Sequence, residues 1–199
     1  MKKLFILACS VSVLVLLSGA AFADSIKGRI GVTGRLGFLI PSDSDVYDAP
    51  YELDTDVGFI GGGGLIYGIT KNFAAELDIT YTEFDADAGP YKAADFETTN
   101  ISLGAQYRFV DLPLRQLVPY VGAGVDILVN DATNAEVDTT AGIHVSGGVD
   151  YFVLKQLALT AEAKAVLAPD ADIKYQGAHV GDYDPSSFAT TFGVRYFFN

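Results

Sequence analysis

Apolar and polar residues alternate along most of this chain with a period of two. In residues 28–40, which read GRIGVTGRLGFLI, Ile30 and Val32 lie on one face, and Arg29 and Arg35 lie on the other. This alternation predicts a β-strand between two different environments, because successive side chains of a strand point to opposite faces. Seven further segments alternate in the same way: 56–69, 73–84, 97–109, 118–130, 141–153, 157–167 and 188–198.

The lengths of the strands and connectors indicate how the strands are arranged. Each predicted strand exceeds the five or six residues that are usual in soluble proteins and is long enough to cross a bilayer at a tilt. Long polar connectors at one end alternate with short ones at the other, which is typical of outer-membrane barrels. The sequence therefore predicts an all-β fold, an eight-stranded antiparallel up-and-down transmembrane β-barrel with both termini at the short-turn end. The long connectors are 41–55, 85–96, 131–140 and 168–187, and the short ones are 70–72, 110–117 and 154–156.

Charge separates the two faces of the predicted strands. We assign no charged residue to the apolar face, and ten balanced charges to the other. Balance suits an enclosed lumen, because an unpaired buried charge is costly. These charges would either line and gate an aqueous path, or fill the narrow lumen with salt bridges. The ten are Arg29, Arg35, Glu76, Asp78, Arg108, Asp126, Asp150, Glu162, Lys164 and Arg195.

Adjacent strands suggest which of these charges meet. We expect Glu76 or Asp78 to lie near Arg108, since their strands are neighbours in the predicted order. On the same argument, Glu162 or Lys164 should lie near Arg195.

A soluble barrel of the lipocalin kind would alternate with the two faces exchanged. Two features favour the membrane barrel. The polar face is crowded with glycine, which suits a narrow interior better than a solvated exterior. Aromatic residues of the apolar face gather at the short-turn ends, where rings favour the membrane–water interface. This predicted aromatic girdle comprises Tyr67, Phe73, Tyr107, Phe109, Tyr151, Tyr196 and Phe198.

The first 23 residues form a predicted signal peptide, which leaves residues 24–199 as the barrel domain. Lys2 and Lys3 precede an apolar run, and an Ala-x-Ala cleavage site ends at Ala23. A lipoprotein signal is the alternative, but it would place Cys9 inside the apolar run. Cys9 is the single cysteine, so the exported chain would hold no disulfide.

Composition excludes several kinds of chemistry. The net charge of −12 argues against nucleic acid, whose phosphates need a basic surface. With two histidines and no cysteine in the exported chain, we expect neither a zinc site nor a cofactor. Most of the 25 acidic residues lie in or beside the long connectors. These connectors could bind divalent cations or lipopolysaccharide, but no stretch completes a calcium-binding loop, and solvated, mutually repelling loops are the preferred interpretation.

His144 and Ser146 are weak catalytic candidates. Residues two apart on a strand share a face, as a nucleophile and its base must. Lipid A deacylases are similar in carrying His-x-Ser on a barrel strand. The alternation places both residues inside the barrel, however, and Gly147 stands where that family has Asn.

Four stretches resemble the small outer-membrane β-barrel superfamily, and its OmpW-type members most. The terminal strand is similar to the signal by which the barrel-assembly machinery recognises such proteins, although Asn199 follows its last aromatic residue. The resemblance implies a Gram-negative outer membrane and a narrow passive channel for small or hydrophobic solutes. A non-conducting structural or adhesive barrel is the alternative, and a lipid A-modifying enzyme is the third. The stretches are ITKNFAAELDITY (69–81), NISLGAQYRF (100–109), PYVGAGVDI (119–127) and the terminal strand.

Overall fold

The computed structural model describes residues 25–42, 53–55, 57–88, 91–113, 116–132, 136–175 and 178–198. The predicted signal peptide lies outside these ranges. Among the described residues, no helix is long and apolar enough to cross a membrane.

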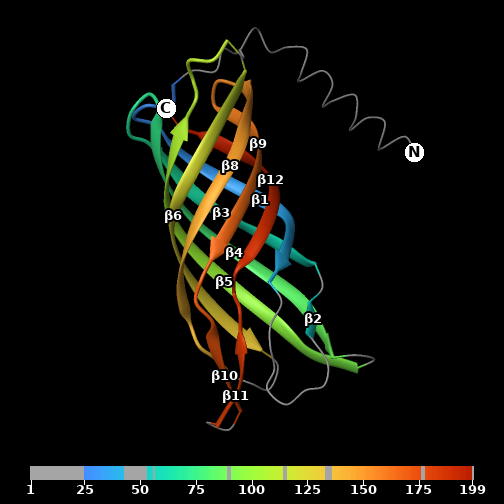
Figure 1. Cartoon of the computed structure of the whole chain (residues 1–199). Coiled ribbons are helices and arrows are strands. Elements are labelled where there is room, and N and C mark those ends of the chain that lie inside the picture. The colour runs from blue at the N-terminus through green and yellow to red at the C-terminus, as the bar shows by residue number, and fades with distance from the viewer. Residues whose placement is uncertain are drawn as a thin grey trace, which may run out of the picture.

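Eight antiparallel strands form a closed barrel (Figure 1). Each strand pairs with its neighbours in chain order, and β1 pairs with β12 to close the sheet. Closure leaves no exposed barrel edge, as hydrocarbon requires of a spanning sheet. The prediction of an eight-stranded up-and-down barrel is confirmed. Its strands are β1 (Ile30–Pro41), β3 (Gly58–Gly68), β4 (Phe73–Ala88), β5 (Tyr91–Arg108), β6 (Leu117–Ala132), β8 (Thr140–Leu154), β9 (Leu157–Leu167) and β12 (Ser187–Phe197).

The long connectors contain more strand than the sequence indicates. The prediction of a loop at 85–96 is wrong, because β4 and β5 continue as a hairpin through most of it. Short strands occupy parts of the other three: β2 (Leu53–Thr55), β7 (Glu136–Val137), β10 (Ala171–Tyr175) and β11 (Ala178–Tyr183). β2 pairs with the extension of β4, whereas β7, β10 and β11 form a separate small sheet. We call the end of the barrel that carries these segments the loop end, and the opposite end, which carries the short connectors, the turn end.

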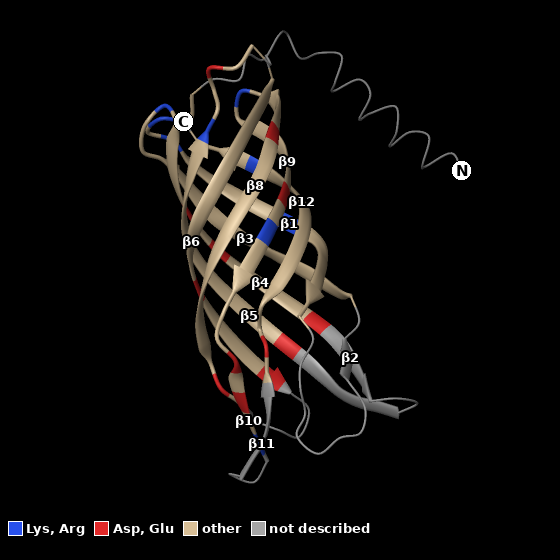
Figure 2. Ribbon diagram, viewed as in Figure 1, with Lys and Arg blue, Asp and Glu red and all other residues tan. Residues whose placement is uncertain are grey.

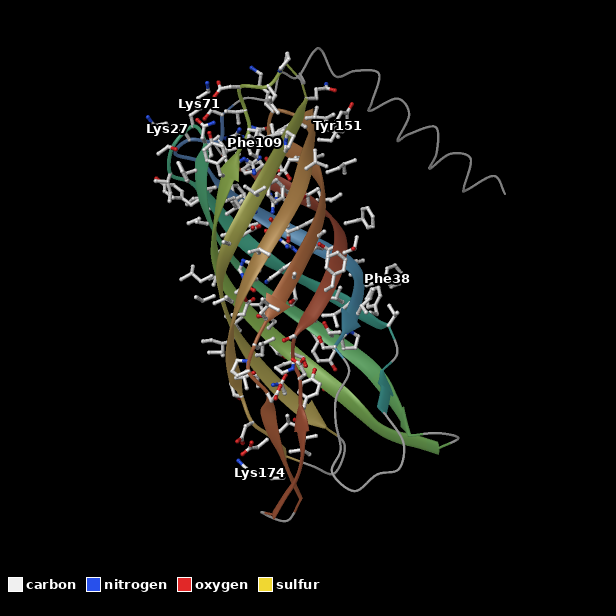
Figure 3. The ribbon with its side chains drawn as sticks, in the orientation of Figure 1. Lys27, Phe38, Lys71, Phe109, Tyr151 and Lys174 are labelled. Carbon is white, nitrogen blue, oxygen red and sulfur yellow. The ribbon has the colours of Figure 1, made fainter. Side chains whose placement is uncertain are left out.

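The outer wall is apolar along the strands. Phe38, Phe192 and Val145 are about 60% exposed, and side chains of this kind project outward around the barrel (Figure 3). The expectation of an uncharged outer face is wrong at Glu83 and Glu97, which are exposed and opposite each other in the β4–β5 ladder. Both lie near the loop end, beyond most of the apolar positions of their strands.

An apolar cluster fills the lumen at the turn end. It contains Ile26, from the segment before β1, and six strand residues that are almost completely buried. The segment is fixed by a hydrogen bond of 2.7 Å from the Gly28 nitrogen to the Gly68 carbonyl. Gly28 has φ +74°, a conformation that favours glycine. The six strand residues are Ile66, Ala74, Val118, Phe152, Ala158 and Phe197.

Arg29 lies at the rim of this cluster. Its guanidinium donates hydrogen bonds to the carbonyls of Lys155, Phe197 and Phe198, and it lies 5.5 Å from the centre of the Phe197 ring. The N-terminal segment is thereby joined to the last strand and to the β8–β9 turn.

Candidate functional site

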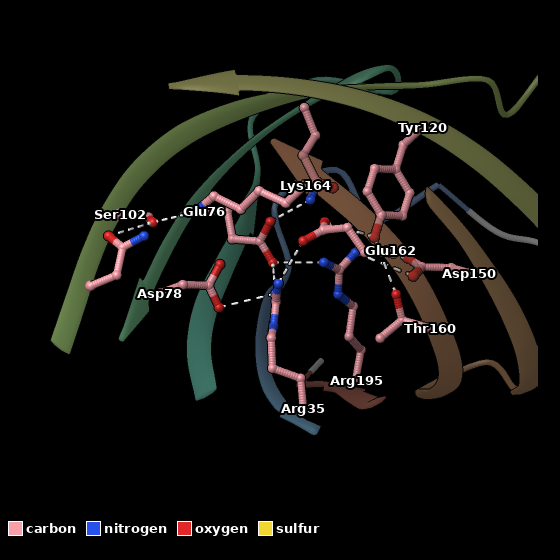
Figure 4. A network of polar contacts seen from close by, with 12 residues as sticks. Arg35, Glu76, Asp78, Ser102, Tyr120, Asp150, Thr160, Glu162, Lys164 and Arg195 are labelled. Carbon is pink, nitrogen blue, oxygen red and sulfur yellow. Dashed lines mark hydrogen bonds and ion pairs between the residues drawn. The ribbon is translucent and has the colours of Figure 1, made fainter. Parts of the chain in front are cut away.

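Nine of the ten predicted charges lie inside the lumen, and Arg29 lies at the turn-end rim. The nine come from β1, β4, β5, β6, β8, β9 and β12, so strands on opposite sides of the barrel contribute charges to the lumen, and Figure 4 shows most of them. The nine residues are Arg35, Glu76, Asp78, Arg108, Asp126, Asp150, Glu162, Lys164 and Arg195.

The deepest ion pairs lie next to the apolar cluster. Arg195 and Asp150 are 0% exposed, and Arg108 is 1% exposed. Arg108 Nη2 lies 2.6 Å from Asp150 Oδ2, while Arg195 contacts Asp150 at 3.2 Å and Glu76 at 2.6 Å. Because charge-assisted hydrogen bonds to desolvated groups are strong, these contacts hold four strands together across the lumen.

Tyr120 lies among these arginines and was not anticipated from the sequence. Its ring centre is 5.7 Å from the Arg108 guanidinium and 5.0 Å from that of Arg195. Its hydroxyl donates to Glu162 at 2.9 Å. Gly148 provides space for the ring, because a Cβ there would collide with it. The two-residue alternation places Tyr120 on the inner face, which was the available signal.

Arg35 forms the next layer toward the loop end. Its guanidinium contacts three carboxylates, with Glu162 at 2.7 Å, Glu76 at 2.9 Å and Asp78 at 3.0 Å. Gln106 also donates to Glu76. One cation thus faces three anions at this level of the lumen.

Of the two expectations for adjacent strands, the one for Arg108 is wrong, whereas Glu162 does lie close enough to Arg195 to interact with it electrostatically. Arg108 pairs with Asp150 rather than with Glu76 or Asp78, and Arg195 pairs with Asp150 and Glu76. The reason is register. In the β5–β6 ladder, Arg108 lies opposite Tyr120. In the β4–β5 ladder, Glu76 lies opposite Gly104, four residues before Arg108, so the charges of these adjacent strands lie at different heights in the lumen.

A third cluster contains the two weak catalytic candidates. His144 Nδ1 lies 2.6 Å from Asp126 Oδ2, and Lys164 donates to the other oxygen of Asp126 at 2.9 Å. Asp126 is a partner that the sequence did not reveal, since it lies on another strand. His144 is buried, and Ser146 faces a lumen cavity. The lipid A-modifying hypothesis would need both side chains on the lipid side of the wall.

Arg35 lines two cavities in the lumen, an outer one and an inner one. The outer cavity lies toward the loop end and is lined by charged, hydroxyl and apolar side chains. The inner cavity is lined largely by polar groups, His144 and Ser146 among them. Four charged residues line both cavities and so separate them: Arg35, Asp78, Glu162 and Lys164.

The outer cavity has an amphipathic lining. Thr80, Thr82, Thr98, Asn100 and Thr191 supply polar groups. Apolar side chains line the cavity from β1, β3, β6, β9 and β12, and Tyr183 and Pro185 contribute from the segment between β10 and β12. The apolar lining comprises Leu39, Ile60, Leu128, Val166 and Ala189.

All seven residues of the predicted aromatic girdle point outward and are exposed. Tyr107 makes edge-to-face contacts with Phe73 at 5.2 Å and with Phe109 at 5.0 Å, and Tyr196 makes one with Phe198 at 5.2 Å. Figure 3 labels Phe109 and Tyr151 toward the end that holds Lys27 and Lys71, opposite Lys174. A role at the membrane interface stays a prediction.

The acidic loop end is only partly described. Figure 2 shows acidic residues around β10, but the predicted loop at 43–52 and the side chains of 84–96 lie outside the described residues. Within the described part of the chain, no group of three or more His, Cys, Asp or Glu side chains could hold a metal ion.

Comparison with protein families gives a match over residues 9–198 to the outer membrane protein beta-barrel domain. The chain belongs to this family. It is therefore an outer-membrane protein, and the predicted location and barrel superfamily are confirmed. A search of curated proteins finds no match.

Several solved outer-membrane barrels share this architecture. OprG of Pseudomonas aeruginosa has a TM-score of 0.71 at 18% identity, over 89% of this chain and 99% of OprG. Neisserial surface protein A has a TM-score of 0.61 at 18% identity, over 85% and 97%. OmpW of E. coli has a TM-score of 0.54 at 19% identity, over 86% and 98%. At these identities the likeness is one of fold, and it includes the predicted OmpW type.

Proposed function

We propose that this outer-membrane barrel is a narrow passive channel for small solutes with apolar bodies. The observation that carries the proposal is the outer cavity, which lies inside the barrel toward the loop end and has an amphipathic lining. In barrels of this kind the long loops face outside the cell and the short turns face the periplasm. A solute from outside would therefore meet the outer cavity first, and then the four charged residues that separate it from the inner cavity.

The lumen is filled toward the turn end. The ion pairs of Arg108, Asp150 and Arg195 and the apolar cluster below them fill the turn end. Transport through the lumen would require these layers to move. The interior charges would then set the selectivity among the ions that pass through the lumen.

Planar-bilayer conductance of the refolded barrel domain, residues 24–199, tests the proposal. We expect discrete conductance steps, and a changed reversal potential in a salt gradient when Arg35 or Arg108 is replaced by Gln. Lys71→Gln, at an exposed turn position, is the matched control and should leave the reversal potential unchanged. An identical reversal potential in both lumen variants would remove these arginines from the path.

The filled turn end favours a second candidate, a structural or adhesive barrel that does not conduct. Its test is the same recording, in which a demonstrably folded barrel would give no steps. Deletion of residues 43–54, which lie in the predicted connector 41–55 between β1 and β3, should then weaken cation or surface binding without preventing assembly. Loss of assembly instead would refute a role confined to the loop.

A further inference from the structure

The buried ion-pair network is one positive charge short. The network consists of Arg35, Arg108 and Arg195 together with the carboxylates that pair with them. These three arginines face four carboxylates. Lys164 does not supply the missing charge, because it pairs with a separate carboxylate, that of Asp126. Buried charges that lack compensation are costly, so such a network favours an additional cation. The four carboxylates are Glu76, Asp78, Asp150 and Glu162.

Asp78 is the carboxylate with the weakest compensation. Its one ion-pair partner in the described chain is Arg35, at 3.0 Å, and Arg35 is shared with Glu76 and Glu162. Asp78 Oδ1 is buried, and it accepts no hydrogen bond from the part of the chain that the structure describes. By contrast, Glu76 contacts two arginines and Gln106, and Asp150 contacts two arginines.

The position of Asp78 makes it reachable. It is 7% exposed, and it lines both the outer and the inner cavity. Figure 4 shows its carboxylate at the edge of the network, joined to the remainder through Arg35. A cation that entered the outer cavity would therefore meet Asp78 before the more deeply buried Asp150.

We propose that the outer cavity binds a small organic cation, with its ammonium group at Asp78 and its apolar body against Leu39, Ile60 and Leu128. An ammonium group can donate three hydrogen bonds, and Asp78, Thr80 and Thr191 supply acceptor oxygens in the lining of the same cavity. A bare inorganic ion would use the carboxylate but leave the apolar lining without a partner. This inference deepens the proposed function, since it names the class of solute that the same cavity takes.

The charge of the loop end favours the same class. The chain carries a net charge of −12, and Lys92 and Lys174 are the only basic residues in the four long connectors. A negative potential at the entrance raises the local concentration of cations and their rate of entry.

Equilibrium binding to the refolded barrel domain in zwitterionic micelles tests the inference without requiring transport. The probes are n-butylammonium, 1-butanol and butanoate, which have similar size and differ in charge. Methyl NMR signals of Ile60 and Leu128 report occupancy of the cavity. We expect saturable shifts with butylammonium, and binding at least about tenfold weaker with butanol, which corresponds to about 1.4 kcal/mol.

Two variants examine the role of Asp78. Asp78→Asn should reduce butylammonium affinity at least about tenfold, to the level of butanol. Thr80→Lys, two residues along the same inner face, supplies the missing cation and should abolish butylammonium binding while Asp78 remains. Glu83→Gln, on the outer face of the same strand, is the control and should bind as the native chain does. Circular dichroism verifies that each variant is folded.

The inference is overturned if butanol binds as tightly as butylammonium, if no probe binds, or if both Asp78→Asn and Thr80→Lys retain native affinity. The first result would leave an apolar cavity and the proposed channel intact. Conversely, butylammonium binding in a barrel that gives no conductance steps would support the site and refute the channel.

Discussion

Arg195→Met should be among the most destabilising substitutions in this barrel. The guanidinium is 0% exposed and contacts both Glu76 and Asp150. Its removal leaves two arginines facing four carboxylates, so the uncompensated negative charge rises from one to two. Breaking a buried ion pair by removing one partner costs about 3–5 kcal/mol. We expect a loss of this size in the free energy of unfolding, whereas Met conserves much of the packing volume.

Urea unfolding in phospholipid vesicles measures this loss. The chain has no tryptophan, so far-ultraviolet circular dichroism is the suitable signal. Lys71→Met is the matched control, because it removes an exposed ion pair with Asp111 at the turn end. Solvent screens exposed pairs, so this control should unfold at the native midpoint.

A double variant distinguishes charge from packing. Glu76→Gln combined with Arg195→Met leaves two arginines facing three carboxylates, which restores the native excess of one. The double variant should therefore lose less stability than the sum of the single variants, by about 1–3 kcal/mol. The reasoning is refuted if Arg195→Met loses less than about 1 kcal/mol, or if the two single effects are additive.

Three further predictions concern the apolar cluster, the lipid-facing wall and Tyr120. Ile26→Ala should lower the free energy of unfolding by about 2–5 kcal/mol and expose a cysteine placed at Val118 to a water-soluble thiol reagent; unchanged labelling would mean that Ile26 does not seal the lumen. Phe192→Arg should cost about 2–4 kcal/mol in vesicles, and a native unfolding midpoint would place Phe192 away from the hydrocarbon. Tyr120→Phe should cost about 1–3 kcal/mol by leaving Glu162 without its hydroxyl donor, so a neutral result in urea unfolding would show that water replaces it.

The amino-acid sequence by itself determined the number of strands and the face on which most side chains lie. Both follow from a local rule, since a strand between lipid and lumen needs alternating apolar and polar residues. The rule correctly placed the nine lumen charges and the seven outward aromatic residues. It did not predict that β4 and β5 continue as a hairpin through most of 85–96, because this segment is short of large apolar residues and was interpreted as a polar connector.

Only the tertiary structure decided which charges meet. Contacts across the lumen depend on strand tilt, stagger and closure, which no single segment encodes. Thus Arg195 reaches Glu76, and Arg35 reaches Glu162, from non-adjacent strands. Closure also brings Ile26 beneath Phe197 and leaves Asp78 at the edge of the network, because residues at opposite ends of the chain become neighbours when β1 pairs with β12.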